Sequence, residues 1–254
     1  MFGAGAQKLI EPDWVASSNI RALVTTRHGG SSKRPFDSFN LAFHVGDDPQ
    51  IVLGNRARLR AITGIDDMQW LDQEHGRRVV AATPATANGP PVTADASYTV
   101  ASNVALAVLV ADCVPLLLAA DDGSVVAAVH CGWRGTVSGV VEAAVGALHI
   151  SPDRVLAWLG PGICQRCYPV GDIVHDALDA GERALALAVD EDSGDQPRWR
   201  MDLPALVAHR LRCCGVCRVF PSALCTACDD QFYSYRRDGS TGRMAALIWR
   251  VSNA

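Results

Sequence analysis

Three apolar runs in the middle of the chain constrain its fold most. Residues 104–110 and 114–119 are continuously apolar over the length of a strand, and residues 124–129 form a third, largely apolar run. Continuous apolar character is typical of strands that are buried on both faces. Asp112 and Pro115 interrupt the region, which is wrong for a membrane-spanning helix. We therefore expect an α/β protein with buried sheets and no membrane partner.

The flanking segments predict further elements without a linker between them. Residues 22–26 and 155–159 have the composition of short strands and are followed by glycine-containing turns. Residues 48–62 predict a helix. Because no repeat or low-complexity segment divides the sequence, we expect residues 1–254 to form one domain.

Two predictions concern the ends of later elements. Thr136 follows a strand and a glycine-containing turn, and it is expected to cap a helix that runs to Leu148. Asp238 and Gly239 are expected to form the turn of a closing hairpin, whose last strand covers residues 244–249.

Charge and cysteine content favour a small-molecule substrate and a reducing compartment. The net charge is −4 and the basic residues are dispersed, which argues against a nucleic acid as partner. The first 14 residues lack the features of a secretory signal. Nine cysteines, an odd number, indicate reduced thiols or metal ligands more than a disulfide framework. We expect a cytoplasmic protein.

Three residues have the side chains that zinc prefers as ligands. His75, Cys113 and His130 lie at the ends of predicted strands or in turns beside them, where side chains can converge on a pocket. A catalytic zinc usually takes three protein ligands and keeps a fourth position open. Spacing alone leaves a second interpretation, in which Cys113 is a small buried hydrophobe and each histidine a satisfied polar residue.

Seven short motifs support the first interpretation. They are TRHGG at 26–30, NL followed by HVGDDP at 40–49, DQEHG at 72–76, ADA at 94–96, ADCVP at 111–115, HCGWRG at 130–135 and SYRRDG at 234–239. In this order they resemble the laccase-domain family, once labelled polyphenol oxidases and now regarded as purine nucleoside phosphorylases. The likeness extends from Arg21 to Trp249.

The resemblance implies a fold, a metal and an activity. The fold would be a single-domain mixed-sheet α/β sandwich, and the metal a zinc ion held by His75, Cys113 and His130. The substrates would be purine nucleosides and phosphate. Adenosine, inosine, guanosine and methylthioadenosine would be cleaved to the free base and a ribose 1-phosphate, with deamination of adenosine by a metal-activated water as a side activity.

Four further residues are candidates for substrate binding. Arg27 and Arg134 could bind phosphate, because a guanidinium matches the geometry of phosphate oxygens and Arg134 is expected just before a helix. Each could instead brace a surface turn. The resemblance suggests that Asn40 and His44 line the nucleoside site, although either could simply fix a loop.

Two aspartates could serve as acid/base groups or could orient a metal ligand. Asp95 fits either role. Asp112 flanks a proposed ligand, and in an extended strand its side chain would point away from the metal, so we favour an orienting role for it. No histidine is followed by Glu in the His-x-Glu pattern of nucleic-acid deaminases, so a deamination would need another proton carrier.

Two other activities would use the same residues. Cys113 could be the nucleophile of a hydrolase, with His130 or His75 as its base. A copper-dependent polyphenol oxidase would need the paired His-x-His motifs of a trinuclear copper centre, and the sequence contains none. Copper is therefore less expected than zinc. We expect a monomer or a homodimer.

Three C-x-x-C pairs remain outside these schemes. They are Cys164 with Cys167, Cys214 with Cys217, and Cys225 with Cys228. The last two pairs are close in sequence, but their seven intervening residues are fewer than a zinc ribbon usually has. We favour packed reduced thiols for all three pairs, with a second zinc site as the alternative.

Overall fold

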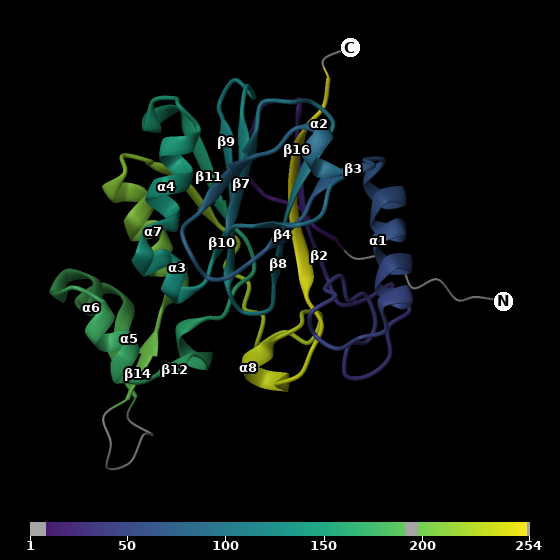
Figure 1. The fold of residues 1–254 in the computed structure, drawn as a ribbon. Helices are drawn as coiled ribbons and strands as arrows, with labels where there is room; N and C mark the ends of the chain where they lie inside the picture. Colours follow the sequence, from purple (N-terminus) through teal and green to yellow (C-terminus); the bar gives the residue numbers. More distant parts are fainter. Residues whose placement is uncertain (1–8, 191–197, 253–254) are drawn as a thin grey trace.

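The computed structural model describes residues 9–190 and 198–252 as two large packed sheets, two smaller sheets of three and two strands, and helices on both outer faces (Figure 1). Residues 1–8, which hold part of the stretch examined for a secretory signal, lie outside this description. Within the described residues, no helix is long and apolar enough to cross a membrane. That residues 1–254 make up one domain stays a prediction.

The three apolar runs are strands, as predicted. They are β8 (Val104–Val110), β9 (Val114–Ala120) and β10 (Val126–Cys131), and every residue in them is buried. Strand β8 belongs to one sheet, whereas β9 and β10 belong to the other. The short connection between β8 and β9 therefore passes from sheet to sheet, and it carries Cys113.

The first sheet has the strand order β1-β2-β16-β8-β3. Its further strands are β1 (Leu9–Ile10), β2 (Ile20–Thr25), β16 (Met244–Arg250) and β3 (Asp67–Gln69). Strand β16 pairs antiparallel with β2 and β8, and β3 pairs parallel with β8. The predicted strands near 22–26 and 244–249 are confirmed.

The second sheet has the order β15-β11-β9-β10-β7-β5. Its further strands are β15 (Arg218–Pro221), β11 (Val155–Leu159), β7 (Ala96–Thr99) and β5 (Val79–Ala81). The parallel pairs are β11 with β15 and β5 with β7. Parallel and antiparallel pairs thus occur in both sheets, which confirms the mixed-sheet prediction.

Three apolar clusters account for the layers. One lies between the sheets and combines side chains of β8 and β16 with those of β9 and β10. A second packs α4 (Val140–Ala147) and α7 (Leu203–Cys213) onto the second sheet, and a third packs α1 (Pro49–Thr63) onto the first. Figure 1 shows α1 on one side of the strands and α4 with α7 on the other. The predicted α/β sandwich is confirmed.

Helix α1 forms where the sequence predicts a helix, but the single helix predicted after Thr136 does not form. Asp48 caps α1 by accepting a hydrogen bond from the amide of Gln50 at 2.8 Å. The later segment divides into α3 (Trp133–Ser138) and α4, because Gly139 between them has a φ of 96°. Thr136 is therefore inside α3, and its hydroxyl donates to the carbonyl of Gly132.

The closing hairpin is a wrong prediction. Residues Tyr235–Asp238 form a single helical turn, α8, which Ser234 caps by accepting from the amide of Arg237. Gly239 ends it with a φ of 66°. A dipeptide that favours positive φ suits the end of a helix as well as a hairpin turn, and strand β16 then pairs with β2 and β8 rather than with a neighbouring segment.

The remaining elements are short. They are β4 (Leu71–Asp72), α2 (Pro84–Ala87), β6 (Val92–Thr93), the 3₁₀ turns η1 (Pro152–Arg154) and η2 (Gln165–Cys167), β12 (Pro169–Val170), α5 (Asp172–Ala177), α6 (Ala180–Ala186), β13 (Leu187–Val189) and β14 (Trp199–Met201). Of these, β4 leads into the loop that carries His75, and η2 leads toward Tyr168, so both help to position the site described next.

Candidate active site and metal centre

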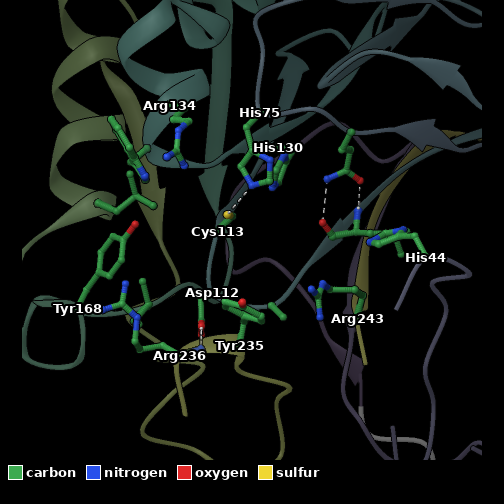
Figure 2. Close-up of a pocket in the computed structure, with 16 residues that line it drawn as sticks. His44, His75, Asp112, Cys113, His130, Arg134, Tyr168, Tyr235, Arg236 and Arg243 are labelled. Atoms are coloured by element: carbon green, nitrogen blue, oxygen red, sulfur yellow. Dashed lines mark hydrogen bonds between the residues drawn. The ribbon is translucent and has the colours of Figure 1, made fainter. Parts of the chain in front are cut away.

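His75, Cys113 and His130 lie together although they come from three separate segments. His75 follows β4, Cys113 lies between β8 and β9, and His130 is in β10. Their ligand atoms all lie within 4.8 Å of one another. His75 Nε2 is 3.9 Å from Cys113 Sγ, and the two imidazole rings meet edge to face with centroids 4.8 Å apart (Figure 2).

The backbone around this group is shaped for close approach. A Cβ on Gly132 would lie 2.6 Å from the His75 ring and 3.2 Å from Cys113 Sγ. A Cβ on Gly135 would meet the carbonyl oxygen of Gly76 at 2.8 Å. The glycines of the HCGWRG motif therefore let the start of α3 approach the His75 loop, which no larger residue would permit.

Asp95 holds two of the three residues in place. Its buried carboxylate accepts from His130 Nδ1 at 2.8 Å, from the Gly76 amide at 2.7 Å and from the His75 amide at 2.9 Å. Since Nδ1 of His130 donates to Asp95, Nε2 is the ring nitrogen on the side of Cys113 that could bind a metal. Burial alone would raise the pKa of Asp95, but these hydrogen bonds outweigh it and hold that pKa below its usual range.

Cys113 and His130 favour each other's charged forms. Burial alone would raise the pKa of Cys113, but His130 and His75 lower it to about 6. Burial alone would lower the pKa of His130, but Cys113 and Asp95 raise it to about 9. Without a metal, the pair therefore favours a thiolate beside an imidazolium. A metal ion would replace the proton of His130.

This group lies at a cavity of about 480 Å³. Its walls consist of His44, Gln73, His75, Leu109, Ala111, Asp112, Cys113, His130, Trp133, Arg134, Ile163, Tyr168, Leu203, Tyr235, Arg236 and Arg243. In Figure 2, Arg134 and Tyr168 lie on one side of Cys113, and His44 and Arg243 on the other. Apolar and aromatic walls with a few convergent polar groups are typical of a site for a small organic ligand.

Three arginines line the cavity, namely Arg134, Arg236 and Arg243. Arg134 lies over the ring of Trp133 at 4.5 Å, and Arg236 over the ring of Tyr168 at 4.8 Å. Arg243 donates to the carbonyls of Thr241 and Gly242, which leaves part of its guanidinium for a ligand. Guanidinium groups in this arrangement suit an anionic ligand such as phosphate.

Comparison with known proteins decides the family. A family model described as multi-copper polyphenol oxidoreductase laccase matches residues 21–251. The chain belongs to this family. It is 44% identical to a purine nucleoside phosphorylase of Pseudomonas aeruginosa, over 94% of this chain and 97% of that protein. It is 41% identical to purine nucleoside phosphorylase YfiH of Escherichia coli, over 96% of this chain and 99% of that protein.

Solved structures of similar proteins share the fold. Neisseria meningitidis protein NMB0706 is 40% identical with a TM-score of 0.90, and the match covers 96% of this chain and 99% of that chain. YlmD from Geobacillus stearothermophilus is 32% identical with a TM-score of 0.88, over 99% of each chain. The laccase-domain resemblance read from the motifs is therefore confirmed.

The structure brings together some of the predicted substrate residues and not others. His44 and Arg134 line the cavity with the three proposed ligands. Arg134 is the second residue of α3 rather than a residue before a helix. Asp95 lies behind His130, whose Nδ1 donates to its carboxylate, and it is not one of the lining residues.

Arg27 and Asn40 are outside the cavity lining. Arg27 contacts Asp37 at 3.4 Å and Asp238 at 3.8 Å, and its guanidinium lies over the Tyr233 ring. Asn40 is buried and donates to the carbonyl of Ala42, and its side-chain oxygen accepts from the amide of Arg243. These contacts match the alternative considered for each residue, in which it braces a loop.

Sequence reasoning assigned no role to Tyr168, Tyr235, Arg236 or Arg243, although all four line the cavity. Tyr235 and Arg236 belong to the SYRRDG motif, so that motif could have identified them as candidate site residues. Asp112 also lines the cavity, with a φ of 94° instead of the extended conformation expected. Its carboxylate accepts from the Thr226 hydroxyl and from the Arg236 amide, both at 2.6 Å.

Proposed function

We propose that this protein is a zinc-dependent purine nucleoside phosphorylase. The observation that carries the proposal is the position of the His75, Cys113 and His130 group beside Arg134, Arg236 and Arg243 in one cavity. Relatives that are 37–44% identical over more than nine-tenths of this chain are named purine nucleoside phosphorylases, which supports the same reaction here. Phosphate would attack the sugar carbon that bears the base while the bond from that carbon to the purine nitrogen breaks, and the purine would leave with the proton that the hydrogen phosphate gives up.

The donor set fits zinc. Two imidazoles and one thiolate are preferred zinc ligands, and three ligands leave an open position toward the cavity. Asp95 fixes the His130 ring in the orientation that ligation needs. When bound, the zinc ion would supply Lewis-acid polarisation of a substrate atom.

The chain's own groups suit the two substrates. Arg134, Arg236 and Arg243 would bind phosphate and place it behind the anomeric carbon. The apolar and aromatic walls would bind the purine, with His44 at the same wall as Arg243. Burial raises the pKa of Tyr168 to about 12, so its hydroxyl stays protonated and can donate to a substrate atom.

Adenosine, inosine, guanosine and methylthioadenosine would be substrates, and adenosine would also be deaminated slowly. A homodimer and a monomer both remain compatible with a site formed by residues of one chain.

The test is phosphate-dependent release of adenine from adenosine by protein whose zinc and copper contents are measured. The wild type and Cys113→Ala are compared, with Cys217→Ala as a matched control because Cys217 is exposed and does not line the cavity. We expect base release from the wild type and the control, and a loss of at least about a hundredfold in Cys113→Ala. A zinc-loaded wild type that releases no base from any of the four nucleosides contradicts the proposal.

A thiol hydrolase is the second candidate, because Cys113, His130 and Asp95 have the connectivity of a nucleophile, a base and an orienting carboxylate. The two candidates respond differently to metal. Ester hydrolysis by this thiolate would be fastest in the metal-free protein, whereas nucleoside phosphorolysis would need the metal. An activity of the metal-free protein on activated esters, without base release by the metal-loaded protein, favours the hydrolase.

A further inference from the structure

Four cysteines outside the cavity lining form a second cluster. They are Cys164, Cys167, Cys225 and Cys228, and their sulfur atoms all lie within 4.8 Å of one another. Cys164 directly precedes the 3₁₀ turn η2 and Cys167 is its last residue, whereas Cys225 and Cys228 lie in the loop between β15 and α8. Two C-x-x-C pairs that are 61 residues apart in sequence therefore meet in space.

The sheet explains why these pairs meet. Strands β11 and β15 are parallel neighbours, so the loops that follow them leave the sheet at the same edge. The link continues beyond the strands, since the amide of Thr226 donates to the carbonyl of Gly162 at 3.1 Å.

The third pair, Cys214 with Cys217, precedes β15 and lies outside the cluster. It is separated from Cys225 by the length of that strand, about 13 Å for four residues. Cys214 and Cys217 therefore do not join Cys225 and Cys228 in one cluster, in agreement with the short spacing between these two pairs in the sequence.

The spacing of the sulfur atoms suits a shared metal ion. Cys167 Sγ is 3.3 Å from Cys228 Sγ, and Cys164 Sγ is 3.8 Å from it. Four thiolates at about 2.3 Å from a tetrahedral zinc ion lie about 3.8 Å from one another. All nine cysteines are free thiols in this structure.

Nearby donors would stabilise four thiolates. The amide of Cys164 donates to Cys225 Sγ at 3.3 Å, and Arg166 Nη2 lies 3.3 Å from Cys228 Sγ. A zinc ion with four thiolates carries a net charge of −2, so a backbone donor and a guanidinium beside the sulfurs are favourable.

We propose that Cys164, Cys167, Cys225 and Cys228 bind a second zinc ion with a structural role. Four protein ligands close the coordination sphere, so this ion would take no substrate. It would join the segment with Ile163 and Tyr168 to the segment that leads to Tyr235 and Arg236, two parts of the cavity wall. The ion would therefore hold one wall of the nucleoside site together.

The first experiment measures metal per chain in protein purified under reducing conditions. We expect about two zinc ions in the wild type and about one in Cys113→Ser, which keeps the four-cysteine site. The double variant C167S/C228S should hold about one, and the control C214S/C217S about two, since it removes the C-x-x-C pair outside the cluster. A single zinc ion in the wild type that disappears in Cys113→Ser overturns the proposal.

A second measurement uses the wild-type chain alone, in case the double variant does not fold. Alkylation followed by peptide mapping compares the zinc-loaded chain with the chelator-treated one. The four clustered cysteines should be protected at least about tenfold by zinc, while Cys214 and Cys217 label equally in both states. Equal labelling of the cluster with and without zinc, or disulfides among these cysteines in the reduced preparation, contradicts the proposal.

Discussion

The pocket group and the four-cysteine cluster differ in ligands and in surroundings. The pocket group has two imidazoles and one thiolate, is backed by the carboxylate of Asp95, and borders a cavity of about 480 Å³. The cluster has four thiols, is backed by a backbone amide and by Arg166, and lines no part of that cavity. The same chain thus contains an open donor set suited to chemistry and a closed one suited to structure.

The largest expected effect is that of metal removal, which should distinguish the pocket group from the four-cysteine cluster by the order in which they lose their ions. Treatment with a moderate chelator should first remove the pocket ion, because its open position admits a competing ligand, and should lower phosphorolysis at least about a hundredfold. Activity should return with about one zinc ion per chain. Base-release assays and metal analysis on the same samples check this order of loss. If the protein keeps full activity after the first ion is lost, that ion is not the one needed for phosphorolysis, which contradicts the assignment of the weaker site to the pocket.

Asp95→Asn should weaken the pocket site alone. An amide cannot accept from His130 and from the three loop amides of residues 74–76 as a carboxylate does, so pocket metal affinity or activity should fall about 10–100-fold. The four-cysteine cluster should keep its metal. The matched control is Asp122→Asn, an exposed aspartate paired with Arg154. Equal zinc loss from both sites would mean that Asp95 acts through overall stability.

Cys113 should be a reactive thiol in the metal-free protein. Its pKa of about 6 leaves it mostly as thiolate at pH 7, where an ordinary cysteine with a pKa of about 8.5 is only a few per cent ionised. The thiolate population at pH 7 should therefore be about thirtyfold larger. Alkylation rates measured from pH 5 to 9, with glutathione as reference, should rise with a midpoint near 6. A midpoint above pH 8 would remove the support for the thiol hydrolase.

Arg134→Gln should weaken the binding of phosphate more than the binding of the nucleoside. Loss of one guanidinium from the cavity wall should raise the KM for phosphate about tenfold and change the KM for adenosine little. Arg58→Gln is the control, since Arg58 is an exposed residue of α1 that does not line the cavity. An unchanged KM for phosphate would mean that Arg134 does not bind phosphate, and would leave Arg236 and Arg243 as the candidates.

Asp112→Asn tests the connection between the two groups, with the smallest expected effect. Asp112 precedes Cys113, and its carboxylate accepts from Thr226, which follows Cys225. An amide at this position leaves one donor without its acceptor, so we expect a loss of about 1–3 kcal/mol in the free energy of unfolding. Thermal unfolding should show a Tm lower by on the order of 5 °C. Zinc content at both sites should stay unchanged.

Local patterns in the sequence were sufficient for the buried strands, for helix α1 and for the family. Continuous apolar runs need no knowledge of neighbours to predict β8 and β9, and Asp48 caps its helix through a contact two residues away. The proposed pocket ligands were also found, because each is part of a motif that characterises the family. Local sequence patterns gave a wrong prediction at Asp238 and Gly239, because this dipeptide occurs both in hairpin turns and at the ends of helices.

The sequence by itself determined the long buried strands, the family and the residue types that could bind metal; the tertiary structure decided which of those residues meet. The parallel pairing of β11 with β15 brings Cys164 and Cys225 to one edge and leaves Cys217 at the start of β15. The buried carboxylate of Asp95 likewise reaches His130 only because β7 and β10 are paired. The order of strands in the sheet determines which of these side chains lie close together, and the spacing of residues along the chain does not reveal that order.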